Sequence, residues 1–138
     1  MNAKQHLMKK TIKVLVIEDD EYYNNALSNA IQQSVNPMLA KGNYQLILRS
    51  FTNATEYIRK IKSKELECEY TAVFIDYYLG DGINAGHVIE LIKEHSGDAL
   101  VVLLSNEKTI REKTDLVTYD YFVVKDKFAP ALCGLYLQ

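Results

Sequence analysis

The stretch Thr71–Gly82, which reads T-A-V-F-I-D-Y-Y-L-G-D-G, decides the fold of this chain. Its run Ala72–Ile75 is apolar throughout and lacks the alternation of a strand with one face in water. Such a run is typical of a parallel strand that helices cover on both faces. Asp76 ends the run, and a glycine-containing loop follows. A carboxylate at the end of a buried strand is costly unless it is paired, hydrogen-bonded or near a cation. On this stretch alone, a loop-opening or helix-capping role for Asp76 is slightly favoured.

Length and composition favour one domain with its own core. The chain has 138 residues, of which 48% are hydrophobic, and its formal net charge is -2. This charge argues against a general binder of nucleic acid or of anionic membranes. The apolar run Ala99–Leu104 is too short to span a bilayer, and we expect no signal peptide. Cys68 and Cys133 lack metal-ligand spacing and are expected to be free thiols of a reducing, cytoplasmic compartment.

Strand-like and helix-like segments alternate along the sequence. Strands are predicted at Lys13–Ile17, Tyr44–Phe51, Thr71–Asp76, Ala99–Leu104 and Tyr121–Val124. Helices are predicted at about 21–35, 53–64, 85–95 and 106–117, and from Ala129 onward with Pro130 in the first turn. Asn36-Pro37 is expected to end the first of these helices. Residues 1–10 are polar and are expected to form a flexible tail before one domain at 11–138.

Five strand–helix units without an internal repeat predict a three-layer, doubly wound α/β sandwich with a parallel sheet. The commonest strand order for five strands is 2-1-3-4-5, in which ligands bind beyond the carboxyl ends of strands 1 and 3. Tyr44–Phe51 is the more alternating strand, which suits a position near the edge of the sheet.

Polar residues follow four of the predicted strands. Glu18-Asp19-Asp20 follows strand 1, Asp76 ends strand 3, Ser105 follows strand 4 and Lys125 follows strand 5. Clustered carboxylates require a cation, and oxygen-only ligands favour Mg²⁺. A hydroxyl and an ammonium opposite the acids suit the oxygens of a phosphoryl group. The set predicts that Asp76 attacks a phosphoryl group and holds it as an acyl phosphate.

Each of these residues alone also fits an ordinary role. The acid run fits a solvated helix start, Ser105 fits a helix N-cap, and Lys125 fits a solvated residue after a strand. Taken singly, the ordinary roles are favoured. It is much less expected by chance that all these polar residues occur together at the ends of four strands.

The motifs K-V-L-V-I-E-D-D-E, F-I-D-Y-Y-L-G-D-G, V-V-L-L-S and Y-F-V-V-K, in this order and spacing, resemble the CheY-like receiver domain of two-component response regulators, a flavodoxin-like (βα)5 fold. The resemblance covers residues 11–137. It implies that Asp76 is the phosphoacceptor and that Glu18 and Asp19 organise Mg²⁺. It also implies that Asp19, Asp76 and the backbone carbonyl of Tyr78 are direct metal ligands.

The same resemblance implies further roles. Ser105 would move onto the phosphoryl group, Lys125 would pair with it, and Phe122 would be the aromatic switch. Tyr78 and Glu107 match positions that tune dephosphorylation. The sequence departs from the family pattern at Gly80 and Asp126, which replace usual prolines, and in the loop after Asp76, which is about two residues longer than typical.

The predicted function is a receiver that takes a phosphoryl group from a histidine kinase or phosphotransfer protein and signals through a protein-binding face. It is not expected to be an enzyme beyond slow self-dephosphorylation. Since no output segment is evident, the output would need a partner protein or a longer chain. One alternative is a receiver-like interaction module that works without phosphorylation. Another is a Mg²⁺-dependent phosphohydrolase, against which Tyr78 argues, because such enzymes commonly carry a second Asp at that position.

Overall fold

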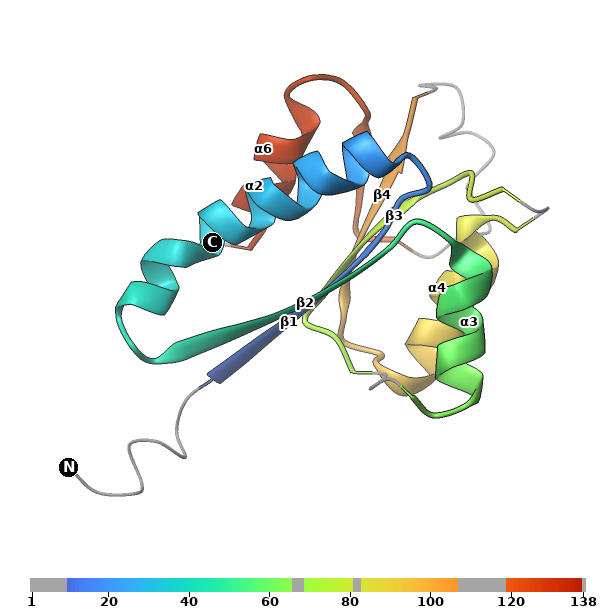
Figure 1. Ribbon diagram of the computed structural model, residues 1–138, viewed down its shortest axis with the longest axis horizontal. Coiled ribbons are helices and arrows are strands. Elements are labelled where there is room, and N and C mark those ends of the chain that lie inside the picture. The colour runs from blue at the N-terminus through green and yellow to red at the C-terminus, as the bar shows by residue number, and fades with distance from the viewer. Residues whose placement is uncertain (1–9, 66–68, 81–82, 107–118, 138) are drawn as a thin grey trace.

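The computed structural model describes residues 10–65, 69–80, 83–106 and 119–137. Its centre is one sheet of five parallel strands in the order β2-β1-β3-β4-β5 (Figure 1). The strands are β1 Lys10–Ile17, β2 Tyr44–Phe51, β3 Ala72–Asp76, β4 Leu100–Ser105 and β5 Tyr121–Val124. The predicted flavodoxin-like strand order is therefore confirmed, and β2 is an edge strand.

Helices cover both faces of the sheet (Figure 1). One core cluster packs α2 (Glu21–Ala40) and α6 (Ala129–Leu135) against the sheet. A second core cluster packs α3 (Ala54–Lys62) and α4 (Ala85–His95) on the opposite side. Because successive side chains of a strand point to opposite faces, the apolar runs supply both cores at once. All five residues of β3 are buried.

The register of the strands places the site residues at one edge of the sheet. Ile17 is paired with Ile75, so the next residue of each chain segment, Glu18 and Asp76, lies at the same carboxyl edge of the sheet. Asp76 is in turn paired with Leu104 of β4, and Ser105 is paired with Val124 of β5. The polar residues that follow these strands are thus close to one edge.

The prediction that Asn36-Pro37 ends the first helix is wrong. Helix α2 continues to Ala40 with Pro37 inside it. A proline removes one backbone donor from the helix, but here it stands near the C-terminal end, and continuation packs Met38 and Leu39 against the core. The helix predicted at 106–117 falls almost wholly outside the described residues.

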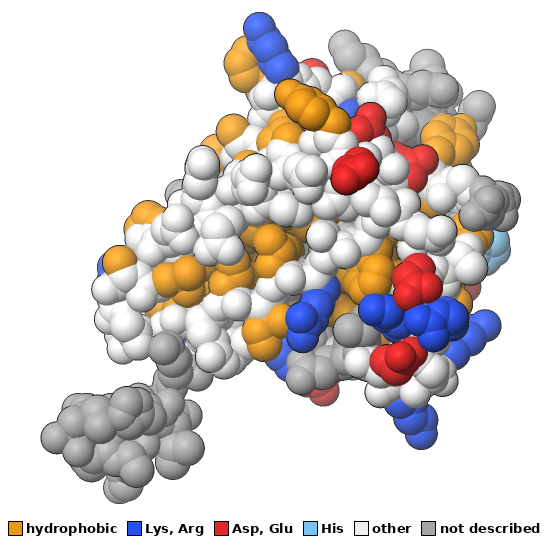
Figure 2. Space-filling model, viewed as in Figure 1, with side chains coloured by type: hydrophobic (Ala, Val, Ile, Leu, Met, Phe, Trp, Pro, Cys, Tyr) orange, Lys and Arg blue, Asp and Glu red, His pale blue; other side chains and the backbone are white. Residues whose placement is uncertain are grey.

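The surface of α2 and β2 reflects the edge position of β2. Figure 2 shows a row of hydrophobic side chains on the face that these two elements form, and acidic side chains near the start of α2. Leu46 and Leu48 of β2 are only partly buried.

No described helix has the length and apolar character that crossing a membrane requires.

Candidate functional site

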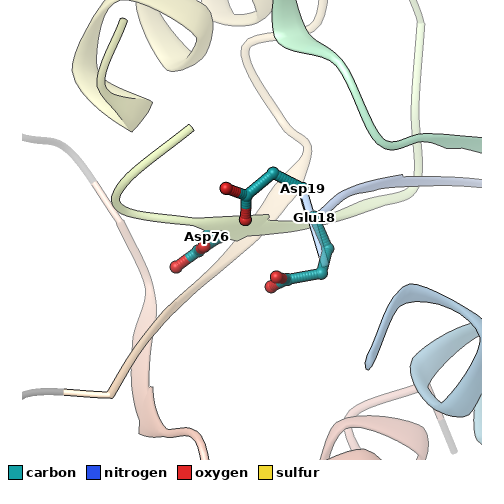
Figure 3. Close-up of side chains that lie close together, drawn as sticks. All are labelled: Glu18, Asp19 and Asp76. Carbon is teal, nitrogen blue, oxygen red and sulfur yellow. The ribbon is translucent and has the colours of Figure 1, made fainter. Parts of the chain in front are cut away.

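Three carboxylates meet at the carboxyl edge of the sheet (Figure 3). Glu18 and Asp19 follow β1, and Asp76 is the last residue of β3. One carboxylate oxygen of each lies within 4.8 Å of the others. Glu18 is fully buried and Asp76 is 6% exposed, whereas Asp19 is exposed to solvent. Two of the three acids therefore lie in a poorly hydrated environment, with the third at its mouth.

Lys125 brings a positive charge to this cluster. Its ammonium Nζ lies 2.9 Å from Glu18 Oε1 and 3.6 Å from Asp76 Oδ2, and the side chain is only 7% exposed. The backbone N–H of Lys125 donates to the carbonyl of Ser105 at 2.8 Å, which continues the pairing of β5 with β4. The side chain consequently projects from a fixed backbone into the acidic cluster.

Two other predicted residues stand on β4 and β5. Ser105 is the last residue of β4 and is 1% exposed. Phe122 of β5 is partly buried against the α3–α4 side of the core, with its ring 6.2 Å from the ring of Tyr119. Glu107 lies outside the described residues.

Tyr78 and Asn84, on either side of the loop after β3, form an antiparallel bridge, so the described residues 77–80 and 83–85 pair as a hairpin. The Leu79 N–H donates to the Ile83 carbonyl at 3.3 Å, and the Ala85 N–H donates to the Tyr77 carbonyl at 3.0 Å. Neither bond uses the carbonyl of Tyr78, which is the predicted metal ligand. Gly80 has φ +76°, a conformation that proline, fixed near -65°, cannot adopt. The glycine that replaces the usual proline is thus what this hairpin requires.

Burial dominates the titration of the acids. Burial, followed by the charge of Glu18, raises the pKa of Asp76 to about 7, although Lys125 opposes the shift. Burial also raises the pKa of Glu18 against the lowering effect of Lys125. For Lys125, burial alone would lower the pKa, but its hydrogen bond to Glu18 and the neighbouring acids raise it. One ammonium therefore does not neutralise the cluster.

The residues present fit a hard divalent cation. Oxygen Oε1 of Glu18 accepts from Lys125 Nζ and from the Asp20 N–H. Oxygen Oε2 is buried, and it is the one such side-chain atom that lacks a hydrogen-bond partner within the described residues. An unpaired buried carboxylate oxygen is costly. The oxygen-only donor set of Glu18, Asp19 and Asp76 is of the kind that Mg²⁺ prefers.

Asp20, the third acid of the run Glu18-Asp19-Asp20, caps a helix and is not part of the carboxylate cluster. Asp20 is the N-cap of α2, and its Oδ1 accepts the Tyr23 N–H at 3.1 Å. Such a cap satisfies one of the free donors at the start of a helix. For Asp20, then, the ordinary interpretation of the acid run is the one that the structure supports.

Asn24 is a site-supporting residue that the sequence interpretation missed. It is 3% exposed, and its Nδ2 donates to the carbonyls of Glu18 at 3.1 Å and Phe51 at 3.0 Å. It therefore ties together the carboxyl ends of β1 and β2. A signal was present, because Asn24 shares the helical face of Leu27 and Ile31, where an apolar residue is expected.

Among solved structures, response-regulator receiver domains have a fold similar to that of this chain. The response regulator DrrB of Thermotoga maritima is 19% identical with a TM-score of 0.67, over 92% of this chain and 51% of DrrB. TrrA of the same organism is 21% identical with a TM-score of 0.61, over 91% of this chain and 97% of TrrA. A two-component response regulator of Cytophaga hutchinsonii is 26% identical with a TM-score of 0.63, over 94% of this chain and 96% of that chain.

The chain thus spans about half of DrrB and nearly all of the other two proteins. No protein-family model and no curated protein matches the sequence. The likeness confirms that the chain has the receiver-domain fold that the motifs predicted. The cluster of Glu18, Asp19 and Asp76 resembles the phosphorylation site of that class.

Proposed function

We propose that this chain is a response-regulator receiver that accepts a phosphoryl group on Asp76 from a histidine kinase or phosphotransfer protein. The observation that carries this proposal is the placement of Asp76, at the end of a buried strand, between two further acids and a buried ammonium. TrrA, which has the same fold, was solved in complex with Mg²⁺ and beryllium fluoride.

The transfer step follows from these positions. A carboxylate oxygen of Asp76 forms a bond to phosphorus, and the phosphorus–nitrogen bond of a phosphohistidine donor breaks. The imidazole leaves with the electron pair and takes up a proton. Lys125, 3.6 Å from Asp76 Oδ2, stabilises the phosphoryl oxygens together with the Ser105 hydroxyl.

In this function Asp19, Asp76 and the Tyr78 carbonyl would hold Mg²⁺, with Glu18 beside them. The cation would offset the negative charge of the acids and of the incoming phosphoryl group. Asp76 must be ionised to act as a nucleophile, and burial opposes ionisation. A neighbouring cation favours the ionised form.

The signal is a two-state population shift in which Ser105 and Phe122 rearrange after phosphorylation and change a protein-binding face. The receiver domain comprises residues 11–138 after a short tail, works in the cytoplasm and acts on a partner protein. It is a phosphoacceptor, not a turnover enzyme, and Tyr78 and Glu107 set its slow self-dephosphorylation.

Incubation with Mg²⁺ and a small-molecule phosphoryl donor tests the proposal by intact-protein mass spectrometry. Wild type is expected to gain one phosphoryl group, labile to hydroxylamine, and Asp76→Asn is expected to gain none. Asp98→Asn, which changes an exposed residue beyond the C-terminal end of α4, is the matched control and retains labelling. An unlabelled wild type beside a labelled control receiver would favour a phosphorylation-independent module. Sustained phosphate release from a phosphomonoester would favour a hydrolase.

A further inference from the structure

Tyr23 contacts Lys125 and the turn that follows it. The ammonium Nζ of Lys125 lies over the ring of Tyr23, 4.7 Å from the ring centroid. The hydroxyl of Tyr23 donates to the carbonyl of Asp126 at 3.3 Å. One side chain of α2 therefore meets both the charged group and the backbone of a segment about a hundred residues later.

The position of Tyr23 is itself fixed. It lies in the first turn of α2, where its N–H donates to Asp20 Oδ1. The ring is half-buried between this helix start and the end of β5. Tyr22, the preceding residue, is 84% exposed and makes no comparable approach among the described residues. The neighbouring tyrosines thus form a natural pair of test and control.

In the proposed function, the acidic partners of Lys125 change during phosphoryl transfer. The side chain is a flexible four-carbon stem, and its two acidic partners are Glu18 and Asp76. Asp76 becomes an acyl phosphate in the proposed function, so the negative charge that Lys125 meets there moves from the carboxylate to the phosphoryl oxygens. The attraction of an ammonium to an aromatic face does not depend on the charge state of the acids.

We propose that Tyr23 is a positioning residue, whose ring holds the Lys125 ammonium beside Asp76 while its hydroxyl anchors the turn at Asp126. This inference rests on the proposed function of Asp76. It separates two contributions of one side chain, the ring and the hydroxyl, which substitutions can remove independently.

Phosphorylation rates measured with a small-molecule donor and Mg²⁺ separate these contributions. Tyr23→Leu removes the ring and is expected to lower the rate about tenfold. Tyr23→Phe keeps the ring and is expected to restore most of the rate. Tyr22→Leu is the control and should match wild type. In a Lys125→Ala background, Tyr23→Leu should cause no further loss, whereas a general structural role would lower the rate in both backgrounds.

Nuclear magnetic resonance provides a readout that does not depend on phosphorylation. The ε-methylene protons of Lys125, assigned with Lys125→Arg, should show an upfield ring-current shift in wild type and Tyr23→Phe. The shift should disappear in Tyr23→Leu, with urea unfolding used to verify that each variant is folded.

The outcomes separate this inference from the proposed function. An unshifted Lys125 in wild type overturns the inference, and so does an unchanged rate in Tyr23→Leu. A wild type that takes up no phosphoryl group overturns the proposed function. If the ring-current shift remains in that case, Tyr23 contacts Lys125 but has no role in phosphoryl transfer. The inference that Tyr23 acts in the reaction is then overturned as well.

Discussion

The buried carboxylate of Glu18 uses its two oxygens unequally in its relationship with Lys125. Oε1 lies 2.9 Å from Lys125 Nζ, while Oε2 is buried without a hydrogen-bond partner in the part of the chain that the structure describes. The salt bridge therefore uses only one oxygen of a carboxylate that also belongs to the cluster with Asp19 and Asp76. The oxygen without a partner fits the cation that the proposed function places at this cluster.

The Glu18→Gln substitution is expected to weaken Mg²⁺ binding by roughly tenfold or more, because it removes one charge from the oxygen donor set. Titration calorimetry of the unphosphorylated protein measures the affinity. Glu21→Gln, an exposed change in the first turn of α2, is the matched control and should bind Mg²⁺ as wild type does. Equal affinity in all three proteins would argue against a metal at this cluster.

The Asp76→Asn substitution is expected to stabilise the metal-free protein as the pH rises. The pKa of Asp76 is raised from 3.8 to about 7 in the folded protein. Between these values the folded state binds more protons than the unfolded state, so wild type loses stability with rising pH. The gain of Asn over Asp should grow from near zero at about pH 4 to on the order of 4 kcal/mol at about pH 8, because each unit of pKa shift corresponds to ~1.4 kcal/mol.

Urea unfolding in the presence of a chelator, repeated across this pH range, measures the difference. Asp98→Asn serves as the exposed comparison. A difference between Asp76→Asn and wild type that does not vary with pH would contradict the raised pKa.

The Tyr78→Asn substitution is expected to shorten the lifetime of the acyl phosphate by roughly tenfold, equivalent to about 1.4 kcal/mol in the barrier. Tyr78 is a bulky, half-exposed side chain two residues after Asp76, and its ring packs edge-on against Tyr77 at 4.8 Å. Its loss admits water to the phosphoryl group. The decay of the phosphorylated mass after donor removal measures the half-life. Tyr22→Asn controls for the loss of an exposed tyrosine, and an unchanged half-life in Tyr78→Asn would count against shielding.

The Asn24→Ala substitution is expected to cost about 1–3 kcal/mol of stability, because it leaves the carbonyls of Glu18 and Phe51 without their side-chain donor. Chemical denaturation measures the loss. Asn25→Ala changes the adjacent, exposed residue and should be nearly neutral. If the two variants are equally stable, Asn24 does not hold the ends of β1 and β2 together.

The Gly134→Ala substitution tests the contact between α2 and α6. A Cβ at Gly134 would lie 3.0 Å from Ser34 Cβ and 3.1 Å from the carbonyl of Ala30. This crowding should outweigh the helix propensity of alanine and cost about 1–2 kcal/mol. Gly97→Ala, where the nearest atom would be 4.0 Å away, is the comparison in thermal unfolding and should be tolerated. Stabilisation by Gly134→Ala would show that the helices separate easily.

The central sheet was predictable because its strands are buried on both faces. The runs ending at Ile17, Asp76 and Ser105 carry no alternation, and their common direction follows from the helices between them. The end of α2 was not predictable from a local rule. Pro37 normally stops a helix, but burial of the residues after it favours continuation.

The candidate site also has a part that was predictable from the sequence and a part that was not. Residues that follow parallel strands must share an edge, so the meeting of Glu18, Asp76 and Lys125 was predictable from their places in the sequence. The contacts of Tyr23 and Asn24 were not predictable, although the position of Asn24 on the buried helix face was, because the contacts depend on how far α2 is rotated over the sheet. That Asp20 caps α2 and does not join the acidic cluster likewise depends on the residue at which the helix begins.

The pairing of Glu18 with Lys125 joins residues 107 positions apart, and the hydrogen bond from Ser34 to Gly134 spans 100 positions. Contacts between residues so far apart in the sequence form late in folding. Closing the long loop costs chain entropy before the contact stabilises the protein. During synthesis the buried Glu18 therefore lacks its Lys125 partner until β5 has left the ribosome. A chain that lacks β5 cannot bring Lys125 to Glu18 and Asp76. Under the proposed function, phosphorylation would therefore report that the C-terminal end of the domain has been made and has docked.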